Sequence, residues 1–111
     1  MRVPVNLGEF EQLILLAILR LGDNAYGVTI RAELADRAGR TVAPGALYTA
    51  FERLEIKGLI RSRMSDPTPQ RGGRAKRCVT VTAAGVEALT RALQAYERLL
   101  DGLNLVRRAH A

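Results

Sequence analysis

The sequence predicts a mainly α-helical fold with a minor β component (mainly α, α+β minor). Three observations predict this class. Apolar residues recur at spacings of three and four in four segments, and one stretch before the last of them alternates as strands do. The composition, with 48% hydrophobic and 25% charged residues, is that of a folded globular protein. Since the chain has 111 residues, we expect one compact core and, at most, one appendage.

The first periodic segment runs from Leu7 to Leu21 and predicts a helix. Its apolar face comprises Leu7, Phe10, Leu13, Ile14, Ala17, Ile18 and Leu21. Leu15, Leu16 and Leu19 fall off that face. A helix that is apolar on more than one side is usually buried between partners, which can belong to its own chain or to another one.

Two further helices follow a turn at "GDNA". One runs from about Tyr26 to Ala38 and stops at Gly39. The next opens at Pro44, closes at Gly58, and has an inner face of Leu47, Ala50, Phe51 and Leu54. The 100° step of a helix then turns the following residues outward or onto the flank: Gly45, Tyr48, Thr49, Glu52, Arg53 and Ile56.

After Gly58 the period changes. "LIRSRM" and "KRCVTVT" alternate as strands do, and the Pro- and Gly-bearing stretch between them predicts a hairpin with a long tip. Thr82 then caps a helix expected from Ala83 to about Arg107. Its heptad seam consists of Val86, Leu89, Leu93, Tyr96, Leu100 and Leu103, with Ala92, Leu99 and Val106 as a second stripe.

This terminal helix is expected to be a rod roughly 37 Å long, from roughly 25 residues at about 1.5 Å each. Because that is longer than one small core can cover, we expect it to pack on another subunit. The alternative is that it folds back on its own core.

Three helices followed by a hairpin form the winged helix-turn-helix arrangement. The sequence therefore predicts a winged helix-turn-helix domain over residues 1–82, with the wing at about 59–82, and a dimerisation helix with a tail over 83–111.

The net charge of +6 is concentrated in one segment. Residues 61–77 hold six basic side chains and one acid, while the rest of the chain is close to neutral. One strongly basic segment on an otherwise nearly neutral chain indicates that the protein binds a polyanion. In "PTPQRGGRAKR", Arg71 and Arg74 beside two glycines suit a narrow groove or a phosphate backbone, with Lys76 and Arg77 on the flank. The alternative is a solvated surface loop.

The third helix adds further candidates for nucleic-acid contact. Tyr48 and Thr49 offer hydroxyls to phosphates, Arg53 can reach a phosphate or a guanine edge, and the small Gly45 allows close approach to a phosphate. The alternative is that Arg53 and Glu52 are ordinary solvated charges.

Other functional classes lack the residues they need. No catalytic set, phosphate-cradling glycine motif or paired carboxylates appear in the sequence, which argues against an enzyme. Cys78 and His110, one of each type, make no disulfide or zinc site, so no metal or cofactor is expected. Cys78 is interpreted as a small strand residue rather than a redox switch. Without a signal peptide or membrane span in the sequence, we expect a cytoplasmic protein with no membrane partner.

The ordered motifs resemble the PadR family of bacterial transcriptional regulators. The resemblance rests on "LGEFEQLILLAIL", "AYGVTIRAEL", "GALYTAFERLEIKGLI", "RGGRAKR" and "VTAAG", which together cover most of residues 7–85. It implies a homodimeric repressor of the family's smaller branch, with one terminal helix, that binds double-stranded DNA at a palindromic operator. The third helix would enter the major groove, and the first and last helices would form the dimer.

Carried onto this chain, the resemblance implies DNA contacts at Tyr48 and Thr49 and in the wing, with Tyr26 as a weaker candidate. The wing contacts would be Arg71, Arg74, Lys76 and Arg77. The expected dimerisation residues are Leu7, Phe10, Leu89, Leu93, Tyr96, Leu100 and Leu103.

Two departures from the family pattern are visible. Cys78 and Val79 stand where relatives commonly have aromatic residues. The sequence has no tryptophan, which some relatives use to stack flat ligands, so although the family pattern implies release by a small hydrophobic effector, no effector site carries over. The alternative function is a winged-helix protein-interaction module without sequence-specific DNA binding.

Overall fold

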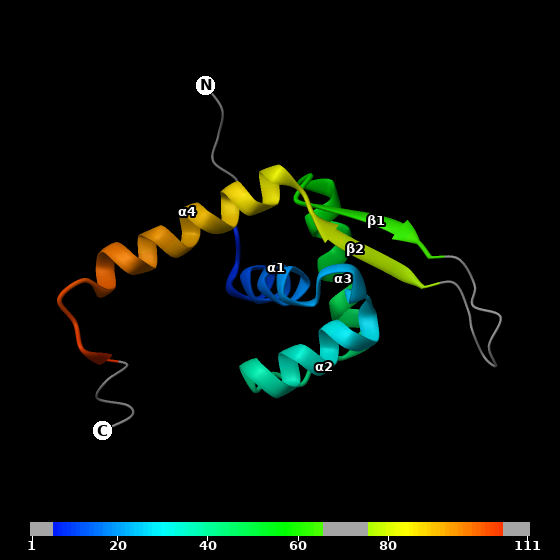
Figure 1. Cartoon of the computed structure of the whole chain (residues 1–111), viewed down its shortest axis with the longest axis horizontal. Coiled ribbons are helices and arrows are strands. Elements are labelled where there is room, and N and C mark those ends of the chain that lie inside the picture. Colours follow the sequence, from blue (N-terminus) through cyan, green and yellow to red (C-terminus); the bar gives the residue numbers. More distant parts are fainter. Residues whose placement is uncertain (1–5, 66–75, 106–111) are drawn as a thin grey trace.

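The computed structural model describes residues 6–65 and 76–105. Figure 1 shows the order of elements, which is that of a winged helix-turn-helix followed by a long helix. The elements are α1 (Glu9–Leu21), a single 3₁₀ turn η1 (Gly22–Asn24), α2 (Gly27–Ala38), α3 (Pro44–Ile56), β1 (Ile60–Met64), β2 (Arg77–Val81) and α4 (Ala83–Leu100). The predicted fold class is confirmed.

α1 and α2 start slightly later than the sequence predicted, while α3 and α4 start at Pro44 and Ala83 as predicted. α1 begins at Glu9, so Leu7 precedes the helix, and the amide of the N-cap Gly8 donates to Glu11 Oε1 at 3.0 Å. Tyr26 is the N-cap of α2 rather than its first residue, and its amide donates to Thr29 Oγ1 at 3.1 Å. Gly39 ends α2 in the left-handed conformation, with φ of +64°, as its sequence position indicated.

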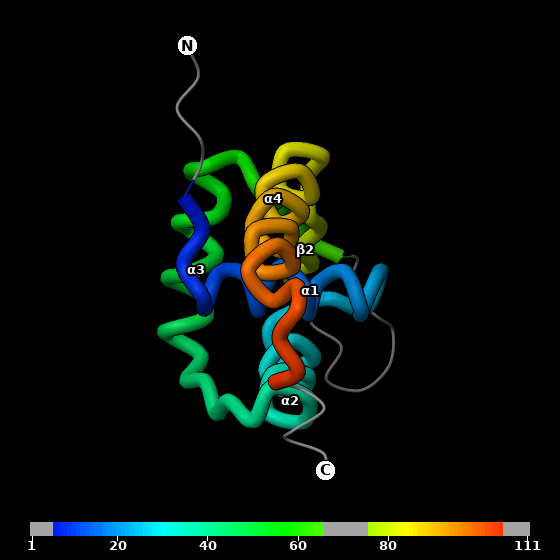
Figure 2. The backbone as a smooth tube through the Cα atoms, turned by 90° about the vertical axis from the view of Figure 1, so that its left-hand side faces the viewer, coloured from blue at the N-terminus to red at the C-terminus, as the bar shows by residue number. Residues whose placement is uncertain are grey.

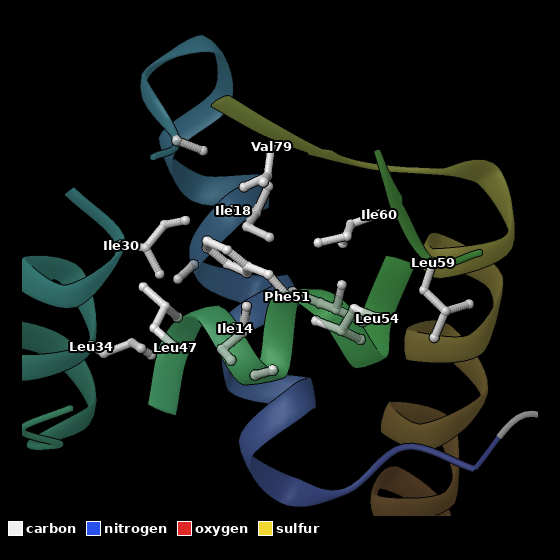
Figure 3. Packing of buried hydrophobic residues seen from close by; sticks show 14 of the residues in the cluster. Ile14, Ile18, Ile30, Leu34, Leu47, Phe51, Leu54, Leu59, Ile60 and Val79 are labelled. Carbon is white, nitrogen blue, oxygen red and sulfur yellow. The ribbon is translucent and has the colours of Figure 1, made fainter. Parts of the chain in front are cut away.

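The core lies where α1 and α3 cross and β2 covers them, as the close view in Figure 3 shows. Phe51 and Leu54 of α3 are fully buried, as is Ile14 of α1. The expectation that α1 contacts a second chain stays a prediction, since Leu19 is 48% exposed. Leu15, which lies off the predicted apolar face, is 0% exposed within its own chain. The reason is that α1 is covered on more than one side by its own chain, because α2, β2 and α4 all contact it.

The hairpin is antiparallel, with Ile60 opposite Val81 and Ser62 opposite Val79. On its other side β2 also pairs with the segment before α2. There Tyr26 and Cys78 form a bridge, and the Val79 amide donates to the Ala25 carbonyl at 2.9 Å. β2 is therefore hydrogen-bonded to the segment before α2 as well as to β1.

α4 is joined closely to the end of α3. The Thr82 hydroxyl caps α4 by accepting from the Gly85 amide at 3.0 Å, and it donates to the Gly58 carbonyl at 2.7 Å. Gly85 has no room for a side chain, since a Cβ there would lie 2.2 Å from the Leu59 carbonyl oxygen. This contact requires glycine, and it sets the direction in which α4 leaves the body.

α4 ends at Leu100, seven residues before the predicted end. Asp101 is extended and Gly102 has φ of +82°, a conformation that favours glycine and stops the helix. Leu103 therefore lies beyond α4, and the heptad spacing that placed it on the helical seam is wrong for this residue. Val106 lies outside the described residues. Figure 2, which views the molecule nearly along α4, shows the helix apart from α2 and α3.

Candidate nucleic-acid interface

One face of the molecule brings together the start of α2, the exposed side of α3 and the part of the wing where β2 begins. Tyr26, Tyr48, Lys76 and Arg77 line one cavity of about 240 Å³, which Gly27 and Val28 complete. Four predicted contact residues, separated by up to 51 positions in sequence, therefore meet at a single site. The cavity has two cationic groups and two phenol hydroxyls, a combination that suits an anion such as a phosphate.

The outward residues of α3 are exposed as the helical period predicted. Gly45, Thr49 and Arg53 follow one another at four-residue spacing and are all exposed. The Thr49 hydroxyl donates to the Gly45 carbonyl at 3.0 Å. Tyr48 on the flank is 43% exposed, and its ring stands edge-on to buried Phe51, with ring centroids 5.7 Å apart. The phenol is therefore held by packing while part of it faces solvent.

Lys76 lies against Tyr26. Its Nζ is 4.4 Å from the centroid of the Tyr26 ring and 3.3 Å from the Tyr26 hydroxyl. Lys76 is exposed. Both contacts are to a neutral group, so the ammonium keeps its positive charge available to an external anion while the ring orients it.

Arg77 has different surroundings. Its Nη2 donates to Glu55 Oε1 at 2.5 Å, and its Nε donates to Ser62 Oγ at 3.0 Å. The Ser62 hydroxyl donates in turn to Glu55 Oε1. Hydrogen bonds from Ser62 and from Arg77 lower the pKa of Glu55 from its ordinary value. Sequence reasoning missed Glu55 and Ser62, because a contact between helix and hairpin has no periodic signal.

A second ion pair anchors the end of α3. Lys57 Nζ lies 2.8 Å from Glu11 Oε1, and it also donates to the Asn6 carbonyl at 3.0 Å. Burial raises the pKa of Glu11, but hydrogen bonds from Lys57 and the Gly8 amide outweigh that effect, so the pKa is lowered overall. The positive charge of Arg53 adds to this lowering. The start of α1 is thereby tied to the end of α3.

Arg71 and Arg74, the predicted contacts at the wing tip, lie outside the described residues. Cys78 is buried in β2 at 8% exposure, which favours its interpretation as a small residue that fills a strand position.

The predicted dimerisation residues divide into two groups. Leu89 is buried in its own core, and Leu7, Phe10 and Leu93 are partly buried against that core. Tyr96, Leu100 and Leu103 are 51%, 43% and 56% exposed. The first part of α4 thus folds onto its own domain, whereas the later part carries apolar side chains in solvent.

Within residues 6–65 and 76–105, no three His, Cys, Asp or Glu side chains are grouped so that they could hold a metal ion. None of the helices described is long and apolar enough to span a membrane.

A model of the family described as "Transcriptional regulator PadR-like family" matches residues 15–91. The chain belongs to the PadR-like family. The predicted resemblance is confirmed, and this is a family of transcription regulators and not of enzymes.

Solved PadR structures have the same fold. A PadR family transcription regulator from Clostridium difficile R20291 is 27% identical, with a TM-score of 0.68 over 87% of this chain and 97% of that one. A PadR family transcriptional regulator from Eggerthella lenta is 26% identical, with a TM-score of 0.64 over 88% of this chain and 85% of the other.

A curated relative from transposon TN4556 of Streptomyces fradiae is named an uncharacterized 37.1 kDa protein. It is 34% identical over 88 residues, which cover 79% of this chain and 23% of that relative. The chain therefore spans about a quarter of the length of this curated relative.

Proposed function

We propose that this PadR-like protein binds double-stranded DNA sequence-specifically as a homodimer and represses transcription. The observation that carries the proposal is the cavity at which Tyr26, Tyr48 and Lys76 meet beside the exposed face of α3. Phenol hydroxyls and an ammonium group at this point suit a DNA backbone phosphate, and the adjacent helical face is free to approach base edges.

α3 serves as the recognition helix in this proposal. An α-helix fits the major groove of B-form DNA, which is about 12 Å wide. Thr49 and Arg53 lie on the same exposed face of α3 and would reach phosphates or bases, with Gly45 allowing close approach at its start. Lys76 then meets the backbone from the wing, and Arg71 and Arg74 at its tip are proposed to grip the flanking groove.

The later part of α4 supports the homodimer. Leu99 is 78% exposed, and it neighbours the exposed Tyr96 and Leu100 on a helix that extends away from the body in Figure 1. Such a stripe is stabilised when a second copy covers it. A two-fold dimer presents two copies of α3 to a palindromic operator whose half-sites lie about one helical turn apart. Residues 1–82 would then read DNA and 83–111 would join the subunits. Release by a small-molecule effector stays a prediction.

Fluorescence anisotropy with DNA from the region upstream of the protein's own gene tests the proposal. We expect a salt-sensitive complex that unlabelled specific DNA displaces and unrelated DNA of equal length displaces poorly. Thr49→Ala with Lys76→Ala should weaken it, while Glu87→Gln on α4, outside this face, should not.

Binding that does not discriminate between the two DNAs, or a double variant that binds like the wild type, would contradict sequence-specific recognition through this face. Association of a protein partner, unchanged by Lys76→Ala, would favour the interaction module instead.

Light scattering that gives a monomer mass at micromolar concentration would exclude the homodimer. Leu99→Glu is expected to shift the wild-type dimer toward monomer.

A further inference from the structure

We infer that Glu55 is a positioning residue that keeps Arg77 as an internal link between α3 and the wing, so that Lys76 contacts the DNA backbone and Arg77 does not. The inference rests on the proposed DNA-binding function. It also assigns to Arg77 a role different from the phosphate contact that the sequence predicted.

Three elements each contribute one side chain to this link. Glu55 comes from α3, Ser62 from β1 and Arg77 from β2, and each is hydrogen-bonded to the other two. The exposed fractions of the Arg77 and Glu55 side chains are 28% and 35%, so water screens the pair less than an ion pair on the open surface. The closed set of bonds fixes the distance from α3 to the two strands of the hairpin.

The guanidinium group of Arg77 also lies near two aromatic rings of α3. Its Cζ lies 5.6 Å from the centroid of the Phe51 ring and 6.0 Å from that of Tyr48. Arginine is suited to this double role, because its edge pairs with a carboxylate while its plane stacks on aromatic rings. Phe51 is 0% exposed, so the link reaches from the surface of the wing to the core.

Lys76, the neighbouring cation, is not paired with a carboxylate in the described part of the chain. Lys76 contacts the neutral Tyr26 ring and hydroxyl, and it can keep both contacts while it meets a phosphate. A phosphate that took Arg77 would have to separate it from Glu55, leaving that carboxylate beside the DNA without its cationic partner and bonded only to the Ser62 hydroxyl. Because the freed carboxylate would repel the DNA backbone, Arg77 stays on Glu55 in the complex.

The salt dependence of DNA binding separates the two roles. Each backbone phosphate neutralised contributes about 0.9 to the slope of log K against log salt. Lys76→Ala is expected to reduce the slope by about 0.9 per subunit. Arg77→Ala should leave the slope unchanged while it weakens binding at every salt concentration, because the wing is no longer held in place. Arg77→Lys should behave like Arg77→Ala, because an ammonium keeps the charge but not the forked geometry.

Glu55→Gln gives the complementary test. Releasing Arg77 should steepen the slope by up to about 0.9 per subunit and reduce discrimination between specific and unrelated DNA. Glu87→Gln is the matched control, since it removes the same charge from an exposed i,i+4 pair with Arg91 on α4. The inference is overturned if Arg77→Ala lowers the slope as much as Lys76→Ala, if Arg77→Lys binds like the wild type, or if Glu55→Gln behaves like Glu87→Gln.

A measurement without DNA distinguishes failure of this inference from failure of the proposed function. Urea unfolding of Glu55→Gln, Arg77→Gln and the double variant should give midpoint shifts that do not add, as expected for side chains in direct contact. Additive shifts would overturn the link even if DNA binds. If the wild type binds no DNA, the proposed function fails and the assignment of Lys76 fails with it, while non-additive shifts would still support the link.

Discussion

The two halves of α3 differ in how they are held. In the later half, Phe51 and Leu54 are fully buried, Glu55 bonds to the hairpin, and the adjacent Lys57 pairs with Glu11 of α1. In the first half, Gly45 and Thr49 are exposed and Tyr48 is partly exposed. The later half is therefore anchored to three other elements by side-chain bonds, whereas the first half is held through the fully buried Leu47 and leaves its outer face in solvent. This arrangement presents binding residues on a rigid support.

The largest effect on stability is expected from removing the buried ring of Phe51 in the later half of α3. Phe51→Ala should lower the free energy of unfolding by about 3–5 kcal/mol, because a fully buried aromatic side chain is replaced by a cavity. Urea unfolding followed by circular dichroism measures the change. A loss below about 1 kcal/mol, the size typical of an average substitution, would mean that the later half of α3 is not the anchored one.

A smaller loss is expected from the ion pair at the end of the helix. Glu11→Gln should cost about 1–3 kcal/mol, because the hydrogen bonds between the Lys57 ammonium and the buried Glu11 carboxylate lose their charged acceptor. Equilibrium unfolding of this variant beside Glu87→Gln, whose side chain is exposed, separates the ion pair from the change in net charge. Equal stability of the two variants would contradict the anchor.

Acid should weaken the anchored half selectively. The pKa values of Glu11 and Glu55 are both lowered in the folded protein, below the ordinary 4.5. Their contribution to stability is therefore fully present above that ordinary value and is lost as the pH falls through the folded pKa values. Unfolding midpoints measured from pH 6 down to pH 3 should decrease, and the decrease should be smaller in the Glu11→Gln, Glu55→Gln double variant. If the unfolding midpoints of the wild type and the double variant decrease equally with pH, the two glutamates are not the cause of the acid sensitivity.

The smallest effect on stability is expected in the open half. Thr49→Ala should change the free energy of unfolding by less than about 0.5 kcal/mol, since Thr49 is exposed and its hydroxyl bonds only to its own helix. The same variant is expected to weaken DNA binding. Thermal unfolding together with the anisotropy titration tests both statements, and a destabilised variant would show that the outer face of this half also supports the fold.

Most of the architecture follows from local patterns in the sequence. The inner face of α3, the stop of α2 at Gly39 and the cap of α4 at Thr82 were all predicted, because helical period and capping depend on neighbouring residues. The burial of Leu15 by its own chain could not be predicted, because burial on a second face of α1 depends on which elements cover it. The end of α4 was misjudged because the spacing of leucines continues past Gly102, whose backbone conformation stops the helix.

The sequence predicted the residues of the candidate site but not the side chains to which they are hydrogen-bonded. Tyr26, Tyr48, Lys76 and Arg77 were chosen separately, and the fold brings them to one cavity. That Arg77 is paired with Glu55 could not be predicted, because the contact depends on how far the hairpin stands from α3. The sequence shows which side chains are charged. Whether such a charge is free to bind an external phosphate depends on the side chains that distant segments place beside it.

The pairing of β2 with the segment at Ala25 has a consequence for how copies of this protein meet in solution. Since β2 is bonded on both sides, β1 is the open edge of the described sheet. An open edge can add strands from other molecules. Arg61 and Arg63 are exposed along β1, so two such edges that approach each other bring like charges together. Part of the basic character of this segment therefore protects the protein against aggregation.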